Sequence, residues 1–179
     1  MREELLKGLA AGAAGTTALN AVTYLDMVVR GRPASTTPEE TVRKVEKALH
    51  IPLSDEGPGG QTAVNRRAGL GALLGITSGL GIGAVYGLVR TRLRKEVPLP
   101  LLATAVGLGT NVATVLPMVA MGVTDPRTWP LSSWLADIVP HLAYGAVTAL
   151  VFEELCPPRR RRLALVARTL PGHPLAGQH

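Results

Sequence analysis

Two residues in the last third of the chain could do acid–base chemistry inside an otherwise apolar segment. Asp137 and His141 stand four positions apart, and this spacing places both side chains on one face of a helix. A carboxylate beside an imidazole can orient the ring, and histidine is the side chain that changes charge near neutral pH. An ionisable pair is costly inside a membrane, so it predicts either a functional site or a tightly bonded contact.

Three more polar residues extend this candidate intramembrane polar site: Tyr144, Asn111 and Asn20. Three interpretations stay open for the site. It can be a static hydrogen-bonded latch between helices, it can line a narrow path for protons or a small solute, or it can bind a metal or another ligand. Two candidate ligands on one helix are too few for a metal, which usually takes at least three protein ligands. We therefore predict no metal and no cofactor.

The elements that must position these residues follow from one stretch of sequence. The chain is uncharged from Ala68 to Val89, and a helix of that length spans about 33 Å, enough to cross a bilayer core of about 30 Å. Glycines recur in it at every fourth position, on one helix-packing ridge against which another backbone can lie closely. They are Gly71, Gly75, Gly79, Gly83 and Gly87.

Three other segments are predicted to be membrane-spanning helices. The first, within residues 1–29, is the most polar and carries a stripe of small and polar residues on one face. The third, 99–123, places Gly107, Asn111 and Thr114 on one face, and the fourth, 131–153, carries Asp137 and His141. The sequence thus predicts an all-α protein, a four-helix transmembrane bundle with a glycine-ridged second helix (68–89). The first helix stands at 1–29, and helices two to four make up a transmembrane part at 68–157.

Two segments are predicted to lie outside the membrane. Residues 30–67 form an extracytoplasmic loop with a short amphipathic helix at 38–50, because apolar residues recur there on one face of a charged helix. Residues 158–179 form a basic tail that we expect to be disordered and cytoplasmic. The tail begins with four consecutive arginines that are expected to set topology and to contact anionic lipid headgroups: Arg159, Arg160, Arg161 and Arg162.

Composition and charge narrow the class of protein. The net charge is +6, but aromatic residues make up only 3% of the chain, and no basic–aromatic pattern for nucleic-acid binding is present. Basic clusters around residues 90–95 and 159–162 favour both termini in the cytoplasm. No nucleophile elbow, phosphate loop, zinc-protease or kinase motif occurs, so we predict no enzyme. The expected partner is the lipid bilayer, and a homo-oligomer or a larger membrane complex stays open.

One stretch resembles a known family. Residues 107–153 carry Pro117, then Met121-Gly122-Val123-Thr124, a short loop with Pro and Trp, and an acid-x-x-x-His-Leu pattern at Asp137, His141 and Leu142. In this it is similar to the YagU-type bacterial inner-membrane proteins, a family of largely unknown function. The resemblance implies a four-span plasma-membrane protein with cytoplasmic termini, in a family that has been associated with acid tolerance. The leading hypothesis is an accessory or envelope-homeostasis protein, and the alternative is a proton or small-solute conductor using Asp137 and His141.

Overall fold

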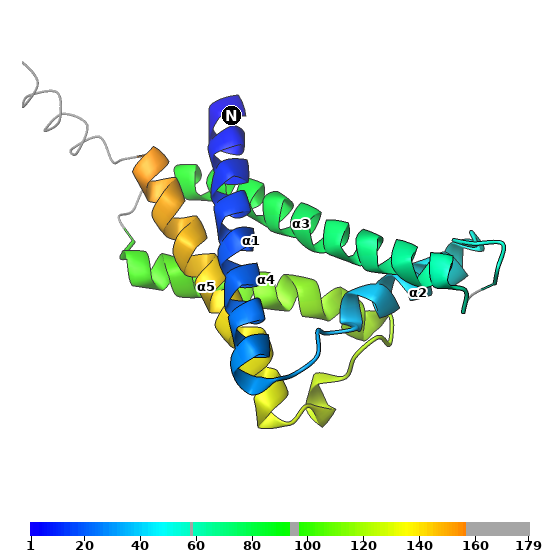
Figure 1. Ribbon diagram of the computed structural model, residues 1–179. Helices are drawn as coiled ribbons and strands as arrows, with labels where there is room; N and C mark the ends of the chain where they lie inside the picture. The colour runs from blue at the N-terminus through cyan, green and yellow to red at the C-terminus, as the bar shows by residue number, and fades with distance from the viewer. Residues whose placement is uncertain (58, 94–96, 157–179) are drawn as a thin grey trace, which may run out of the picture.

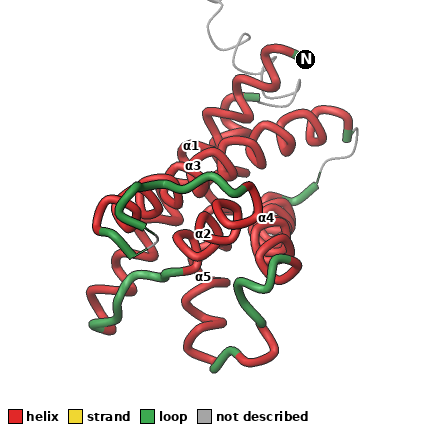
Figure 2. The backbone as a smooth tube through the Cα atoms, turned by 90° about the vertical axis from the view of Figure 1, so that its right-hand side faces the viewer, coloured by secondary structure: helices red, strands yellow, loops and turns green. Residues whose placement is uncertain are grey.

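The computed structural model describes residues 1–57, 59–93 and 97–156, and all regular structure within them is helical (Figures 1 and 2). The described elements are α1 (Arg2–Arg30), α2 (Thr37–Leu49), α3 (Gln61–Arg92), α4 (Leu99–Ala120), the single-turn 3-10 helix η1 (Pro126–Thr128) and α5 (Leu131–Leu155). The all-α class predicted from the sequence is confirmed. The basic positions 94 and 95, Arg159–Arg162 and the predicted tail 158–179 lie outside the described residues.

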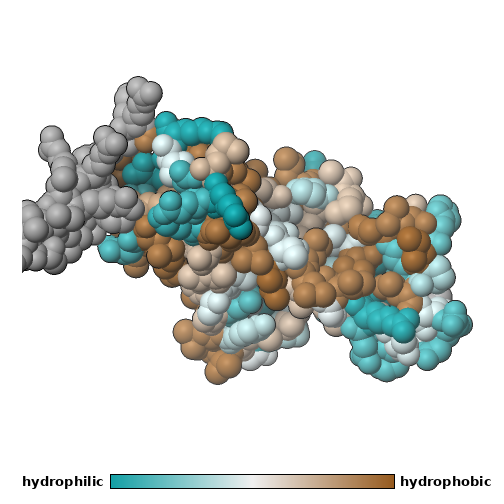
Figure 3. Space-filling model, turned by 90° about the horizontal axis from the view of Figure 1, so that it is seen from above, coloured by the Kyte–Doolittle hydropathy of each residue, from teal (hydrophilic) through white to brown (hydrophobic). Residues whose placement is uncertain are grey.

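Three of the described helices are long and apolar enough to cross a membrane: α3, α4 and α5. Many of their leucine and valine side chains are exposed on the protein surface, which is the pattern expected where lipid is the solvent. Seen from above, hydrophilic residues gather at the two ends of the elongated molecule and hydrophobic surface lies between them (Figure 3). The helix α1 is not among the three, because polar residues interrupt its apolar sequence.

The helices α1 and α5 run side by side in opposite directions, and α3 and α4 cross them (Figure 1). The helix α1 lies against both α3 and α5, α4 lies against α5, and α2 lies against the beginning of α3. At one end, Arg90 of α3 and Glu153 of α5 form a two-pronged ion pair, with Nε to Oε1 at 2.7 Å and Nη2 to Oε2 at 3.2 Å. At the opposite end, Arg30 of α1 donates to the Ser132 carbonyl of α5.

Glycines allow α1 and α3 to approach at the level of their backbones. A methyl group added at Gly83 would lie 2.5 Å from the Gly12 Cα, and one added at Gly12 would lie 2.6 Å from the Gly79 carbonyl oxygen. A methyl group at Gly87 would lie 2.7 Å from the Glu4 carbonyl oxygen. Because contacting carbon atoms are normally about 3.5–4.0 Å apart, α1 can pack here only against residues without side chains.

The five glycines of the ridge have different surroundings. Gly79, Gly83 and Gly87 face α1, whereas Gly71 lies next to Pro38 at the start of α2. Gly75 has nothing within 4 Å of an added methyl group. The crossing of α1 and α3 explains this division, since two helices that cross at a large angle stay in contact over only a few turns.

Local signals set the ends of the helices. Prolines directly precede α4 and α5, at Pro98 and Pro130, and a fixed φ suits this position. Gly31 directly follows the last residue of α1 and caps the helix, and its φ of 59° is a left-handed conformation that glycine adopts without strain. The helix α3 begins at Gln61, before the predicted apolar start at 68. Hydropathy marks the part of a helix suited to lipid, and the helix itself continues through Arg66 and Arg67 into the loop region.

Candidate polar site between α4 and α5

Asn111 of α4 joins the two ionisable residues predicted from the sequence. Its side-chain amide Nδ2 donates a hydrogen bond to Oδ2 of Asp137 and lies 3.4 Å from Nδ1 of His141. His141 Nδ1 is 2.7 Å from the backbone carbonyl oxygen of Asp137 and 3.6 Å from its Oδ1. The side chains of Asp137 and His141 thus meet on the face of α5 that lies against α4.

A fourth residue, Thr114, completes this group. Its hydroxyl Oγ1 is 3.3 Å from Nε2 of His141, so both ring nitrogens of the histidine have a polar neighbour. We call Asn111, Thr114, Asp137 and His141 the α4–α5 network. Thr114 was not singled out as a site residue in the sequence, although its position one turn after Asn111 on the same helix face was a usable signal.

The network is largely enclosed. Asn111 is 9% exposed, and the side chains of His141 and Asp137 are 12% and 24% exposed. Directly beside it, α4 and α5 touch at two glycines that the sequence did not identify as a contact. A methyl group at Gly107 would lie 2.8 Å from the His141 carbonyl oxygen, and one at Gly145 would lie 2.6 Å from the Gly107 Cα.

The other two residues of the predicted site lie elsewhere. The Tyr144 hydroxyl donates to the Gly79 carbonyl oxygen of α3 at 2.6 Å, and the side chain is almost completely buried between helices. Tyr144 is three positions after His141, on an adjoining part of the same helix surface, and from there its side chain reaches α3. Asn20 on α1 is half-buried, and no hydrogen bond joins it to the network within the described part of the chain. The structure therefore brings together three of the five predicted residues.

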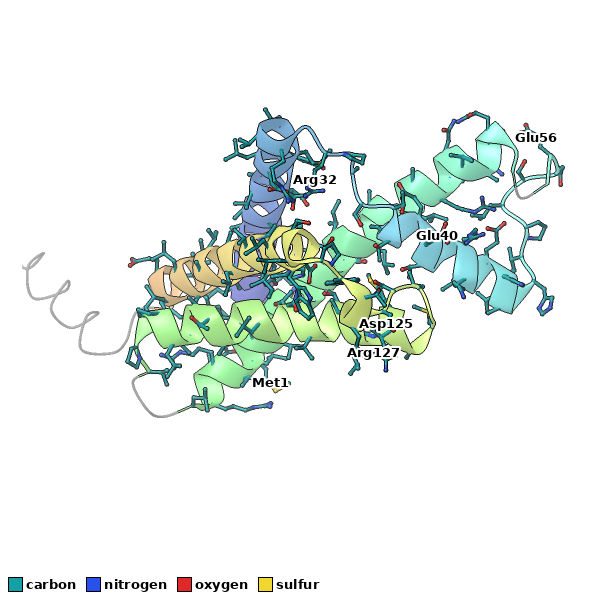
Figure 4. All side chains as sticks on the ribbon, turned by 90° about the horizontal axis from the view of Figure 1, so that it is seen from below. Met1, Arg32, Glu40, Glu56, Asp125 and Arg127 are labelled. Atoms are coloured by element: carbon teal, nitrogen blue, oxygen red, sulfur yellow. The ribbon has the colours of Figure 1, made fainter. Side chains whose placement is uncertain are left out.

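Two charged clusters stand outside the apolar stretches of the helices. Arg67 Nε lies 2.7 Å from Glu46 Oε2, and this ion pair fastens α2 to α3. The hydrogen bonds from Arg67 and from the Leu53 amide hold the pKa of Glu46 below its ordinary value. In the loop between α4 and α5, Asp125 and Arg127 lie next to each other (Figure 4). The Arg127 side chain and amide likewise lower the pKa of the Asp125 carboxyl.

The remaining described features offer little chemistry. A shallow apolar hollow of about 140 Å³ lies between α2 and α3, and its one charged lining residue, Glu46, is occupied by Arg67. Among the described residues, no three His, Cys, Asp or Glu side chains are grouped so that they could hold a metal ion. The α4–α5 network is therefore the best candidate for a functional site in this part of the chain.

Comparison with known proteins adds no assignment. The chain matches no protein-family model, no curated protein and no solved structure.

Proposed function

We propose that this chain is a small four-span membrane protein without a catalytic role, acting as an accessory or envelope-homeostasis protein of a bacterial inner membrane. In this proposal the α4–α5 network is a latch that holds the two helices together. The observation that carries this proposal is that the polar groups of the network have their partners within α4 and α5. Asn111 bonds to Asp137, and both ring nitrogens of His141 have neighbours on α4 and α5 themselves.

The packing next to the network supports a latch more than a conduit. At Gly107 and Gly145 the backbones of α4 and α5 are too close to admit even a methyl group, and a water molecule needs comparable space. Tyr144 and Asn20, which were grouped from the sequence with the possible polar path, do not continue the network. A buried polar group that loses its partner costs free energy, so such a network stabilises one relative position of the two helices.

The four-span arrangement is proposed from the contacts of α1. This helix packs closely against α3 and α5, two of the three helices suited to a membrane. Its polar residues Thr16 and Thr17 bond back to carbonyls of their own helix, which lowers their cost in lipid. The beginning of α1 lies beside the end of α3, at Glu4 and Gly87, as expected if both ends face the cytoplasm. The resemblance to YagU-type proteins implies the same layout.

Topology can be tested with the single cysteine of the chain. Cys156 stands directly after α5, so it should react with a membrane-impermeant maleimide in inverted membrane vesicles and not in intact spheroplasts. Labelling in intact spheroplasts would reverse the orientation. Labelling in neither would call for a second cysteine placed in the loop around Asp125.

The alternative function is conduction of protons or a small solute through the same residues. The observation that favours it is that the Asp137 and His141 side chains, although largely enclosed, keep 24% and 12% of their surface exposed. Proton flux into liposomes carrying the protein separates the two functions, with Asp137→Asn and His141→Ala as variants. A latch predicts no flux above that of empty liposomes and a loss of about 1–3 kcal/mol in the free energy of unfolding of each variant. Flux that disappears in stably folded variants would establish conduction.

A further inference from the structure

The protonated nitrogen of His141 can be assigned from its surroundings. Nδ1 is 2.7 Å from the backbone carbonyl oxygen of Asp137, and a carbonyl oxygen can only accept a hydrogen bond. Nδ1 therefore carries a hydrogen and donates it to this carbonyl. The proton that a histidine gains or loses must then be held at the other nitrogen, Nε2, which faces Thr114.

The hydroxyl group of Thr114 has one hydrogen and three neighbours that can accept it. These are Nε2 of His141 at 3.3 Å and the carbonyl oxygens of Thr110 and Asn111, both at 3.0 Å. With His141 neutral, Thr114 donates to the lone pair of Nε2. With His141 protonated, Nε2–H donates to Oγ1, and the Thr114 hydrogen turns to a carbonyl of its own helix. Either state leaves each of these polar atoms with a partner.

The charges around His141 are few. The helix α4 contributes none, because Leu99–Ala120 contains no ionisable side chain. On α5 itself, Asp137 is the facing charge, with Oδ1 at 3.6 Å from Nδ1. The helix α3 also contacts α5, through the Tyr144–Gly79 bond and the Arg90–Glu153 pair, and its ionisable residues stand towards its two ends: Arg66, Arg67, Tyr86, Arg90 and Arg92. The ionisable residues of α1, which packs closely against α5, likewise stand towards its two ends. They are Arg2, Glu3, Glu4, Lys7, Tyr24, Asp26 and Arg30.

We propose that Thr114 is a positioning residue that allows the α4–α5 latch to take up and release a proton at His141 without opening. The device is the reversal of a single hydrogen bond between Oγ1 and Nε2. This inference rests on the proposed latch function and adds to it a tolerance of changing acidity. Serine in place of Thr114 would keep the device, and valine, which has nearly the same shape but no hydroxyl group, would remove it.

The test compares the stability of Thr114→Val, Thr114→Ser and the unchanged full-length protein in lipid–detergent bicelles. Between about pH 8 and about pH 5, which brackets the ordinary titration of histidine, we expect little change for the unchanged protein and for Thr114→Ser. For Thr114→Val we expect the unfolding equilibrium constant to rise by roughly tenfold on acidification. The reason is that the proton at Nε2 then has no acceptor, so the unfolded state binds protons better than the folded state does.

The matched control is Thr77→Val on α3. Thr77 makes the same kind of bond to carbonyls of its own helix, at 2.8 Å to Leu73 and 3.1 Å to Leu74, and it has no histidine beside it. The unfolding equilibrium constant of Thr77→Val should therefore not rise on acidification. The proposed role of Thr114 would be overturned if Thr114→Val lost the same stability at both pH values, or lost no stability at either.

A spectroscopic measurement keeps the inference testable if Thr114→Val fails to fold. In the unchanged protein with ¹⁵N-labelled histidine, the signals of His141 are assigned by difference against His141→Ala. Retention of the Nδ1 hydrogen through the titration, with the change confined to Nε2, is the expected result. Loss of the Nδ1 hydrogen would refute the inference. If the network is not a latch at all, Asp137→Asn and His141→Ala should instead have the same free energy of unfolding as the unchanged protein.

Discussion

Replacement of Gly83 by alanine tests whether α1 and α3 pack through their glycines. The new methyl group would lie 2.5 Å from both the Gly12 Cα and the Gly8 carbonyl oxygen, and 2.7 Å from the Gly12 nitrogen. All three are backbone atoms, which cannot turn away as a flexible side chain can. Since contacting carbons are about 3.5–4.0 Å apart, the two helices must separate by about 1 Å. Overpacking of this kind costs about 1–3 kcal/mol.

Gly75 provides a matched control on the same helix and in the same ridge. An added methyl group has nothing within 4 Å there, so Gly75→Ala should leave the fold unchanged or stabilise it by up to about 1 kcal/mol through helix propensity. Because the gain in helix propensity is the same at both sites, the two variants should differ by the overpacking cost alone, about 1–3 kcal/mol in the free energy of unfolding. Reversible unfolding of the full-length protein in mixed micelles, followed by circular dichroism, measures this difference.

A double-mutant cycle identifies the partner helix. Gly12→Ala should also be destabilising, because its methyl group would lie 2.6 Å from the Gly79 carbonyl oxygen and 3.0 Å from the Gly83 Cα. Once one methyl group has separated the helices, the second costs less, so the double variant should lose less than the sum of the two single losses. Equal stability of Gly83→Ala and Gly75→Ala would refute the α1–α3 contact. A loss confined to Gly75→Ala would instead indicate a partner on the other side of the helix.

Three further outcomes follow from the same structure. Gly145→Ala should destabilise the protein by about 1–3 kcal/mol in chemical unfolding, whereas Gly109→Ala, which meets nothing within 4 Å, should not. Tyr144→Phe should cost about 0.5–1.5 kcal/mol in the same assay, since it removes the hydrogen bond to the Gly79 carbonyl; no loss would contradict that bond. The pKa of Glu46 is lowered from an ordinary 4.5, so the stability that it contributes is present above about pH 4.5 and is lost as the pH falls through its folded-state pKa. The melting temperature of Glu46→Gln should therefore fall less steeply on acidification than that of the unchanged protein, and parallel curves would refute this role of the ion pair with α3.

The candidate site could be predicted only in part from sequence. The spacing of Asp137 and His141 within one helix was sufficient to place them together, because residues four apart share a helix face. Asn111 was named as a polar residue of the site, but its bond to Asp137 depends on how α4 is rotated against α5. Tyr144 was grouped with His141 and instead faces α3. The number of positions between two residues of one helix does not show which neighbouring helix each of them will contact.

Helical structure and the segments that are apolar enough for lipid could be predicted from the sequence alone. Helix period, proline placement and hydropathy act within a segment and can be read there. Which glycines become contacts depends instead on how the helices pack in three dimensions. Gly75 and Gly83 belong to the same four-residue repeat, yet one is open and the other lies against the backbone of Gly12. The difference arises from the angle at which α1 crosses α3, and that angle is set by all the helices packing together.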